Sequence, residues 1–242
     1  MKIKFMVIVL LVSMGMVAQE SNIGAGQQNS SEKIDDANII SWTAKASGEY
    51  ENVYRFGYSE LESDLVLIFD NDKYYGQIRS GSWKNSGTLW LWKYENLTNI
   101  RVEGSKFYSN QTDGEFVIYD NGKEKKKGLK IYKPWNSYPN AGKSDVGFVT
   151  SSTDKYFAGK YPEASFRLLR SDELTNMSTS DLEIMQNEIY ARYGYKFKEG
   201  SKMDIYLKKQ KWYSGQYDDV NRFLTVIEQS NLNLIQKTKQ LL

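Results

Sequence analysis

The stretch NEIYARYGYKF, from Asn187 to Phe197, predicts the C-terminal end of a helix. Gly194 follows a run of apolar residues at helical spacing, and glycine is the usual left-handed residue just beyond a helix. The apolar residues of that run are Leu182, Met185, Ile189 and Tyr193. Ser180 and Glu183 are spaced as a capping box at the other end. We therefore expect a helix that begins after Ser180 and ends at Gly194.

Two further helices are expected beyond this stretch. A short one is predicted to start at Ser201, because Asp204 follows three residues later in a typical N-cap pattern. The last helix carries one stripe at helical spacing, formed by Val220, Phe223, Leu224, Ile227, Asn231, Leu234 and Ile235. Asn231 is its polar member, so we expect its amide to hydrogen-bond another element. Residues 166–242 are thus predicted to form a small helical domain.

Upstream, residues 41–135 show a period of two, with Tyr, Trp, Val and Ile alternating with polar residues between turn signals. Segments 63–69 and 73–78 are predicted to pair across the turn DND, and segments 115–119 and 128–132 across the loop DNGKEKKK. This pattern predicts an antiparallel β sandwich or small barrel. The fold class expected for the chain is α+β, with the β and helical parts as separate domains.

The remaining segments are predicted to lie outside these domains. Residues 136–165 hold two of the three prolines and several glycines, which predicts a linker with at most a short strand from Val146 to Val149. Residues 1–18 combine two lysines with an apolar run too short to span a bilayer, which predicts a signal peptide. Residues 19–40 are mostly Ser, Gln, Asn and Gly, which predicts a flexible tether. We therefore expect an exported protein, periplasmic or secreted, with no transmembrane segment after signal removal.

The composition excludes several classes of function. The 242 residues contain no Cys and no His, which removes disulfides, thiolate nucleophiles, Ser-His-Asp chemistry and histidine-based metal sites. The chain has 32 Lys and Arg against 30 Asp and Glu, and Lys2 and Lys4 would leave with the signal. A near-neutral chain gives no electrostatic reason to bind nucleic acid. We expect no cofactor, no metal and no nucleic-acid partner.

Carboxylate pairs remain the main hydrolytic option, but none is compelling. Asp70 with Asp72, and Asp218 with Asp219, fall at predicted turns or caps, where Asp is common for backbone reasons. No catalytic residue is therefore assigned, and we expect the protein not to be an enzyme.

Four motifs in the C-terminal part carry a family resemblance. NEIYARYGYKF, MDIYL, KWY and IEQSNLNLI occur in the order typical of the YARHG domain, a family of exported bacterial domains, and the resemblance covers roughly Leu169 to Lys239. The matching positions are Tyr190, Ala191, Arg192, Gly194, Trp212, Tyr213, Glu228 and Asn231. The signature histidine is Tyr193 here, so this chain could not perform chemistry that rests on that histidine. The resemblance implies an extracytoplasmic domain of unestablished function.

The signature itself allows two interpretations. Glu188 and Arg192 are spaced as a helical ion pair, and Arg192 lies in the last turn, where a cation complements the helix dipole. This favours a structural role for the motif. The alternative is that Arg192 binds an anionic ligand through its two-pronged guanidinium.

A row of aromatic residues is the other candidate binding surface. Strand periodicity in GTLWLWKY places Trp90, Trp92 and Tyr94 on one face, where they either belong to a core or form a platform for sugar rings. The lysines from Lys123 to Lys127 are either a solvated hairpin tip or a patch for an anionic surface. The leading hypothesis is a non-catalytic binding module of the cell envelope or exterior, with glycan or cell-wall material as the candidate ligand. The alternatives are a carboxylate-dependent hydrolase and a structural partner-docking protein.

Overall fold

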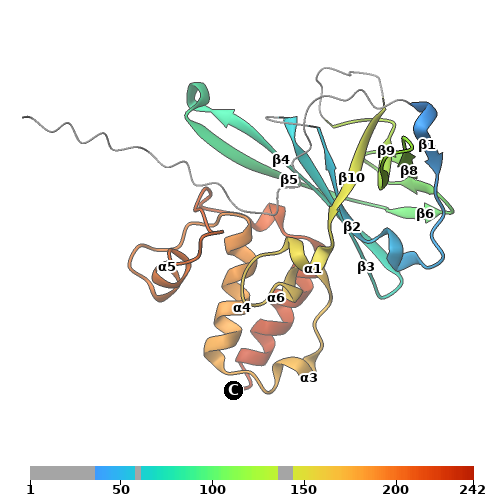
Figure 1. The fold of residues 1–242 in the computed structure, drawn as a ribbon. Helices are drawn as coiled ribbons and strands as arrows, with labels where there is room; N and C mark the ends of the chain where they lie inside the picture. The colour runs from blue at the N-terminus through green and yellow to red at the C-terminus, as the bar shows by residue number, and fades with distance from the viewer. Residues whose placement is uncertain (1–35, 58–60, 136–143) are drawn as a thin grey trace, which may run out of the picture.

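The computed structural model describes residues 36–57, 61–135 and 144–242 (Figure 1). The expected signal peptide and most of the expected tether lie outside these residues. An antiparallel sheet comes first in the described chain and a helical region follows it, which confirms the predicted fold class. Within these residues, no helix has both the length and the apolar character needed to cross a bilayer.

One antiparallel sheet contains the ten strands of the described residues. These are β1 (Ile39–Ser41), β2 (Asn52–Phe56), β3 (Ser63–Asp70), β4 (Lys73–Lys84), β5 (Leu89–Leu97), β6 (Arg101–Glu103), β7 (Lys106–Tyr108), β8 (Asp113–Asp120), β9 (Lys125–Ile131) and β10 (Asp145–Ser151). Their order is β5-β4-β3-β2-β10-β9-β8-β7-β6, and β1 also pairs with β8. The two ends of this order do not pair, so the sheet is open and not a closed barrel.

The sheet surrounds one hydrophobic core to which both of its halves contribute. Leu65 of β3 and Ile78 of β4 share a buried cluster with Phe107 of β7 and Phe116 of β8. Alternate residues along each strand point to this interior face, as the period of two in the sequence predicts. The sheet therefore buries its inner face as a sandwich does, while its edges remain open.

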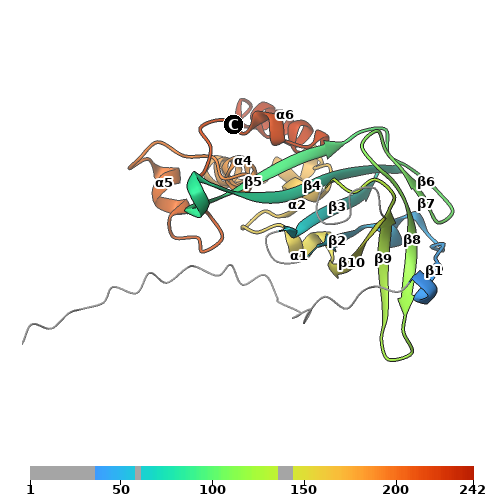
Figure 2. The same ribbon diagram turned by 90° about the horizontal axis from the view of Figure 1, so that it is seen from above.

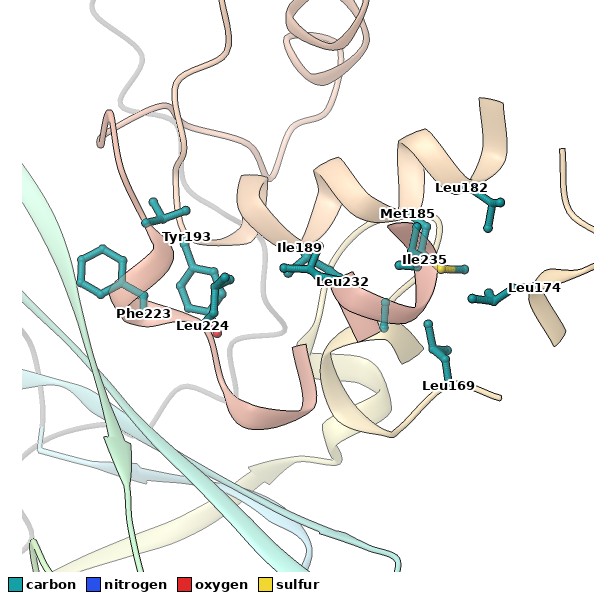
Figure 3. Packing of buried hydrophobic residues seen from close by; sticks show 12 residues of the cluster. Leu169, Leu174, Leu182, Met185, Ile189, Tyr193, Phe223, Leu224, Leu232 and Ile235 are labelled. Carbon is teal, nitrogen blue, oxygen red and sulfur yellow. The ribbon is translucent and has the colours of Figure 1, made fainter. Parts of the chain in front are cut away.

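The helices are short except for two. They are α1 (Thr153–Tyr156), α2 (Glu163–Phe166), α3 (Ser171–Leu174), α4 (Thr179–Arg192), α5 (Lys202–Leu207) and α6 (Val226–Lys239), with 3-10 turns η1 (Asp36–Asn38), η2 (Ser47–Tyr50), η4 (Asn85–Gly87) and η5 (Asn221–Phe223). Helices α4 and α6 lie side by side (Figure 1). Met185 and Ile189 of α4 and Leu232 and Ile235 of α6 fill the space between them (Figure 3).

The predicted start of α4 is wrong by two residues. The N-cap is Ser178, whose Oγ accepts a hydrogen bond from the Asp181 N–H at 3.1 Å. Ser180 and Glu183 instead lie within the helix, where both accept hydrogen bonds from the Lys202 ammonium of α5. Two hydroxyls near one helix start are both reasonable caps, and the sequence alone favoured the wrong one.

The other helix ends agree better with the sequence. Gly194 has a φ of 74° directly after α4, and Ser201 caps α5 through the Asp204 N–H, both as predicted. The closing helix begins later than its apolar stripe, at Val226, with Thr225 and Glu228 as a capping box. The first part of the stripe is the 3-10 turn η5.

The expected linker contains a strand in the middle of the sheet, which corrects the predicted boundary. Strand β10 lies between β2 and β9, and Phe148 pairs with Arg55 on one side and Gly128 on the other. The expected tether likewise contributes Ile39 and Ile40 to β1, which pairs with β8. Both strands are short, and their partners are distant in the sequence, so local pattern predicts at most a fragment of them.

A packed seam joins the sheet to the helices. Val66 and Ile68 of β3 share a buried cluster with Ile227 of α6. The Gln77 amide of β4 donates to the main-chain oxygen of Phe223 at 2.7 Å. Figure 2 shows the helices lying along the β3–β5 side of the sheet. The predicted separate domains are thus in extensive contact.

Candidate functional site

Arg192 of the signature lies inside the helical region. Its guanidinium donates to the main-chain oxygens of Ala158 at 2.7 Å and Tyr161 at 2.8 Å, and to Ser165 Oγ at 2.9 Å. It also forms an ion pair with Glu188 at 3.5 Å, and the two side chains are only 7% and 1% exposed. Burial lowers the pKa of Arg192, an effect that the nearby Glu188 opposes. The structure therefore places Arg192 as an internal clamp between α4 and the α1–α2 segment.

Glu188 completes this clamp from the same helix. Its carboxylate accepts hydrogen bonds from the N–H groups of Lys160 and Tyr161, each at 2.9 Å, and from the Tyr206 hydroxyl at 2.9 Å. Burial and the bond to Glu188 raise the pKa of Tyr206 to about 12. Glu188 thereby attaches both the α1–α2 segment and α5 to α4.

Glu228 is the second buried carboxylate of the motif. It accepts hydrogen bonds from Ser165 Oγ at 2.6 Å, from the Tyr193 hydroxyl at 2.6 Å and from the Thr225 N–H at 3.0 Å. Burial raises the pKa of Glu228, although these hydrogen bonds oppose that rise. Burial and the neighbouring Glu228 raise the pKa of Tyr193 well above its usual value. Tyr193, at the position of the family histidine, is therefore a neutral internal donor.

Asn231 behaves as its position in the apolar stripe predicts. Its Oδ1 accepts from the Leu169 N–H at 2.8 Å, and its Nδ2 donates to the main-chain oxygens of Ala164 at 2.9 Å and Arg167 at 2.8 Å. The predicted hydrogen bonding to another element is confirmed. Asn231 fixes the irregular α2–α3 segment against α6.

The remaining motif residues also have local partners. Ala191 is buried, and Tyr190 packs against the helical core. The Tyr213 hydroxyl donates to the Tyr195 main-chain oxygen at 2.7 Å, and the Trp212 ring lies 6.4 Å from the Tyr213 ring. The motif is thus a scaffold for the helical region.

A shallow depression lies beside α5. Its volume is about 410 Å³, and its lining residues are Lys196, Phe197, Glu199, Asp204, Lys208, Tyr213 and Gly215. Asp204, its most central acid, is paired with the Lys208 ammonium at 2.9 Å and accepts from the Gly200 N–H. The depression therefore offers no free charged group from Asp204.

The weighed carboxylate pairs serve the backbone. Asp70 accepts from the Leu168 N–H at 2.8 Å, and Asp72 has a φ of 58° in the β3–β4 turn. Asp219 accepts from the Asn221 N–H at 2.9 Å, and Asp218 lies 3.4 Å from the Lys196 ammonium. Asp72 and Asp219 have the local turn roles expected from the sequence, whereas Asp70 bonds a distant main-chain N–H and Asp218 pairs with a lysine.

The lysine-rich loop between β8 and β9 is largely paired. Lys125 lies 3.6 Å from Asp120, and Lys126 lies 2.8 Å from Glu124. Lys127 lies 3.6 Å from Glu49. Most of its charge is balanced locally, which favours a solvated hairpin tip.

The long hairpin of β4 and β5 carries the aromatic row. We call residues 79–94 the β4–β5 arm, and Figure 1 shows it reaching away from the centre of the sheet. Along one face, Trp83 lies opposite Trp90, and Arg79 lies opposite Tyr94. The face is the one that turns toward the helices, because Tyr94 contacts them.

The structure divides the aromatic row into a buried end and an open end. The Tyr94 ring packs 4.7 Å from the Tyr193 ring inside the helical core. Trp92 and Trp90 are half-buried, and Trp83 at the open end is 46% exposed. Neighbouring indole planes meet at 74° for Trp83 and Trp90 and at 84° for Trp90 and Trp92. The row is therefore a cluster of edge-to-face rings with one open end, and not a flat platform.

The helical region also covers the outer edge of β5. Gln216 Oε1 accepts from the Trp92 N–H at 3.2 Å, and its Nε2 donates to the Trp90 main-chain oxygen at 3.2 Å. The Tyr217 hydroxyl donates to the Trp92 main-chain oxygen. The Gln216 side chain thus satisfies one main-chain N–H and one main-chain oxygen of this edge strand, as a neighbouring strand would.

A comparison with protein families identifies the helical region. Residues 159–240 match the model of the YARHG domain, so the C-terminal region of this chain is a YARHG domain. Domains of this family are typical of exported proteins. The match starts at Gly159, and so includes the α1–α2 segment that Arg192 and Glu188 hold in place. Searches of curated proteins and of solved structures found no match.

Sequence reasoning missed several partners of the motif. Ser165, which links Arg192 to Glu228, lies in a segment predicted as a linker, and a single serine carries no signal of such a role. Gln216 was not singled out either, although it lies between two motifs of the domain. Arg79 was missed because only the pairing of β4 with β5 brings it beside Trp92.

Proposed function

We propose that this protein is an exported, non-catalytic binding module of the cell envelope or exterior, and that its β4–β5 arm binds glycan or cell-wall material. One observation carries the proposal: the open end of the arm exposes Trp83 by 46% and Leu89 by 42%, whereas the signature residues are engaged internally. Large exposed hydrophobic residues that gather at one end of a hairpin are typical of a contact surface, and the indole ring offers an apolar face to a sugar ring. The YARHG domain then acts as the support that fixes the base of the arm.

The surroundings of the buried carboxylates Glu188 and Glu228 support a binding module rather than a hydrolase. Glu188 and Glu228 are both fully buried, and each accepts three or more hydrogen bonds from the protein. A glycosidase needs two carboxylates that face a sugar from opposite sides of a cleft. These two instead hold secondary structure together, so the proposal assigns them no catalytic role.

The direct test is a binding screen with the mature chain. Immobilised cell-wall fragments and polysaccharides are incubated with the wild-type protein, with Trp83→Ala and with Tyr132→Ala. Tyr132 is a matched control, because it is 43% exposed and lies after β9, away from the arm. We expect saturable binding that Trp83→Ala weakens about tenfold, since losing a stacked ring costs roughly 1 to 3 kcal/mol, while Tyr132→Ala has little effect.

The other outcomes separate the competing hypotheses. Release of soluble sugar during the incubation would favour a carboxylate-dependent hydrolase. Absence of binding to every fragment, with a folded protein, would favour a structural partner-docking protein. Equal loss of binding in both variants would remove the arm as the binding surface.

A further inference from the structure

Arg79 stands out among the described residues because it forms no ion pair, although its cross-strand neighbour on β3 is Asp64. Its guanidinium lies 3.8 Å from the centroid of the Trp92 ring, and its Nη1 lies 3.5 Å from the Tyr156 hydroxyl. Among the described residues it forms no ion pair with a carboxylate, and its buried Nε has no hydrogen-bond partner. A neutral phenol and an indole face are the partners of a half-buried cation. Such a cation is stabilised further by an anion placed in its plane.

The nearest acid is already committed elsewhere. Asp64 accepts from Arg55 Nε at 2.9 Å, and the Tyr156 hydroxyl donates to Asp64 Oδ2 at 3.3 Å. Asp64 lies across from Arg55 on β2 and across from Arg79 on β4, so two arginines share one aspartate and one positive charge remains in excess. The same Tyr156 hydroxyl accepts from Arg79, so the group is fixed in position without being neutralised.

The whole arm has the same sign of charge. Between Arg79 and Tyr94 the chain contains Arg79, Lys84 and Lys93 and no Asp or Glu. Lys84 and Lys93 lie on the opposite face of the hairpin from Arg79, because Lys84 pairs with Leu89 and Lys93 with Ser80. The arm is therefore a local positive field on a near-neutral molecule, which favours an anionic partner.

We propose that the β4–β5 arm binds an acidic polysaccharide, in which Arg79 pairs with a uronate carboxylate and the open tryptophan end, four residues along β4 from Arg79, contacts a sugar farther along the polymer. This inference rests on the proposed function and names the class of its ligand. Stacking on Trp92 holds the guanidinium plane fixed, and a fixed planar fork suits the two oxygens of a carboxylate. Lys84 and Lys93 contribute longer-range attraction along the chain of the polymer.

The test changes the ligand first and the protein second. Wild-type binding is measured to polygalacturonate, to the same polymer with its carboxylates methyl-esterified, to neutral dextran, and to vesicles containing anionic lipid. We expect binding to polygalacturonate that falls about tenfold or more on esterification, because a hydrogen-bonded charge pair is removed. Binding should also weaken as salt rises.

The protein side of the test compares two arginines that both lie over aromatic rings. Arg79→Gln should lose the preference for the acid form, whereas Arg101→Gln should keep it, since Arg101 lies over Tyr108 at the opposite end of the sheet. Unfolding curves establish that both variants are folded. The comparison of acid and esterified polymer needs no variant, so it decides the question even if Arg79→Gln does not fold.

Each of the remaining outcomes would overturn one part of the inference. Equal binding of acid, esterified and neutral polymers would overturn the acidic ligand while leaving glycan binding in place. Unchanged polygalacturonate binding by folded Arg79→Gln would overturn the assignment of Arg79. Binding to anionic vesicles alone would make the partner a membrane surface. Binding to none of the probes would overturn this inference, whereas the screen of cell-wall fragments decides the glycan hypothesis separately.

Discussion

Arg192 shows how far burial changes the meaning of a sequence spacing. From spacing alone, its pair with Glu188 is a helix-surface interaction that stabilises by a few tenths of a kcal/mol. In the structure both side chains are buried, and Arg192 binds three oxygens outside its own helix. Arg192 therefore links α4 to the α1–α2 segment through buried hydrogen bonds.

We predict that Arg192→Lys lowers the free energy of unfolding by about 2 to 4 kcal/mol, because a lysine cannot reach three divergent acceptors and leaves buried groups unpaired. Arg170→Lys is the control: Arg170 and its partner Asp172 are both exposed, so the change should stay within about 0.5 kcal/mol. Urea denaturation of the full chain measures both. Equal stability of Arg192→Lys and wild type would contradict the internal role.

A comparison of Gly194 with Gly200 distinguishes the cost of backbone strain from the cost of a steric clash. A Cβ added there would lie 2.9 Å from the Ser214 main-chain oxygen, whereas a Cβ at Gly200, with a similar φ of 72°, meets nothing within 4 Å. We predict that Gly200→Ala costs about 1 kcal/mol from strain alone, and that Gly194→Ala costs distinctly more. Thermal unfolding of the two variants gives the comparison, and equal losses would mean that the 214–216 segment moves freely.

For individual residues, the sequence predicted structural roles better than it predicted hydrogen-bond partners. Gly194 and Asn231 could be interpreted correctly, because a helix end and a polar residue in an apolar stripe each have one common explanation. The partners of Glu228 could not be predicted, since Ser165 and Tyr193 are distant in the sequence and meet it only when α2, α4 and α6 pack.

Among the elements, the short strand β1 depends on one carboxylate. Glu115 of β8 accepts hydrogen bonds from Ser41 of β1 at 2.7 Å and from Ser105 at 2.9 Å, and it pairs with Lys106 at 2.9 Å. Burial alone would raise the pKa of Glu115, but these bonds outweigh it and lower the pKa to about 2. The ionised form is therefore part of what holds β1 against the sheet.

This shift predicts a defined loss of stability in acid. Because the folded-state pKa of Glu115 lies below its unfolded value, the stabilisation is complete above about pH 4.5 and disappears as pH falls to about 2. The difference in unfolding free energy between wild type and Glu115→Gln should be at most about 3 kcal/mol at pH 6 and should vanish near pH 2. Denaturation at several pH values measures it, with exposed Glu103→Gln as the control. A difference independent of pH would contradict the account.

Elements with a strong local pattern could be predicted, and those without one could not. The β3–β4 and β8–β9 hairpins follow from alternation and turn residues such as Gly122, which has a φ of 79°. Strand β1 was not predicted and β10 was predicted only as a short strand from Val146 to Val149, because the partners of both strands are far along the chain. The arm was visible as an aromatic strand, but its split into a buried Tyr94 and an open Trp83 depends on where the helices end.

For the whole molecule, the seam between sheet and helices changes the expected unfolding behaviour. Gln77 of β4 donates to Asn96 at 2.8 Å and to the Phe223 main-chain oxygen, and its Oε1 lies 3.2 Å from the Tyr193 hydroxyl. Composition alone suggested two separately folding domains. The buried bonds of Gln77 instead connect the sheet to both α4 and the turn before α6.

We predict that sheet and helices unfold together. Tryptophan fluorescence, which reports mainly on the sheet, and circular dichroism at 222 nm, which reports mainly on the helices, should give the same urea midpoint. Gln77→Leu leaves buried polar groups unpaired, so it should lower the free energy of unfolding by about 1 to 3 kcal/mol. Both urea midpoints should fall together. Two separated transitions in wild type would support independent domains.

The central position of β10 sets an order for folding. A chain that is made N-terminus first can form the hairpins on either side early, because they need only local contacts. Strand β2 must wait for β10, since Arg55 pairs with Phe148 and Val53 with Ser151, and closing so long a loop is slow. Until then two unpaired strand edges face the solvent and can join other chains. The interval between synthesis of β2 and synthesis of β10 is therefore when this protein is most exposed to aggregation and to proteolysis.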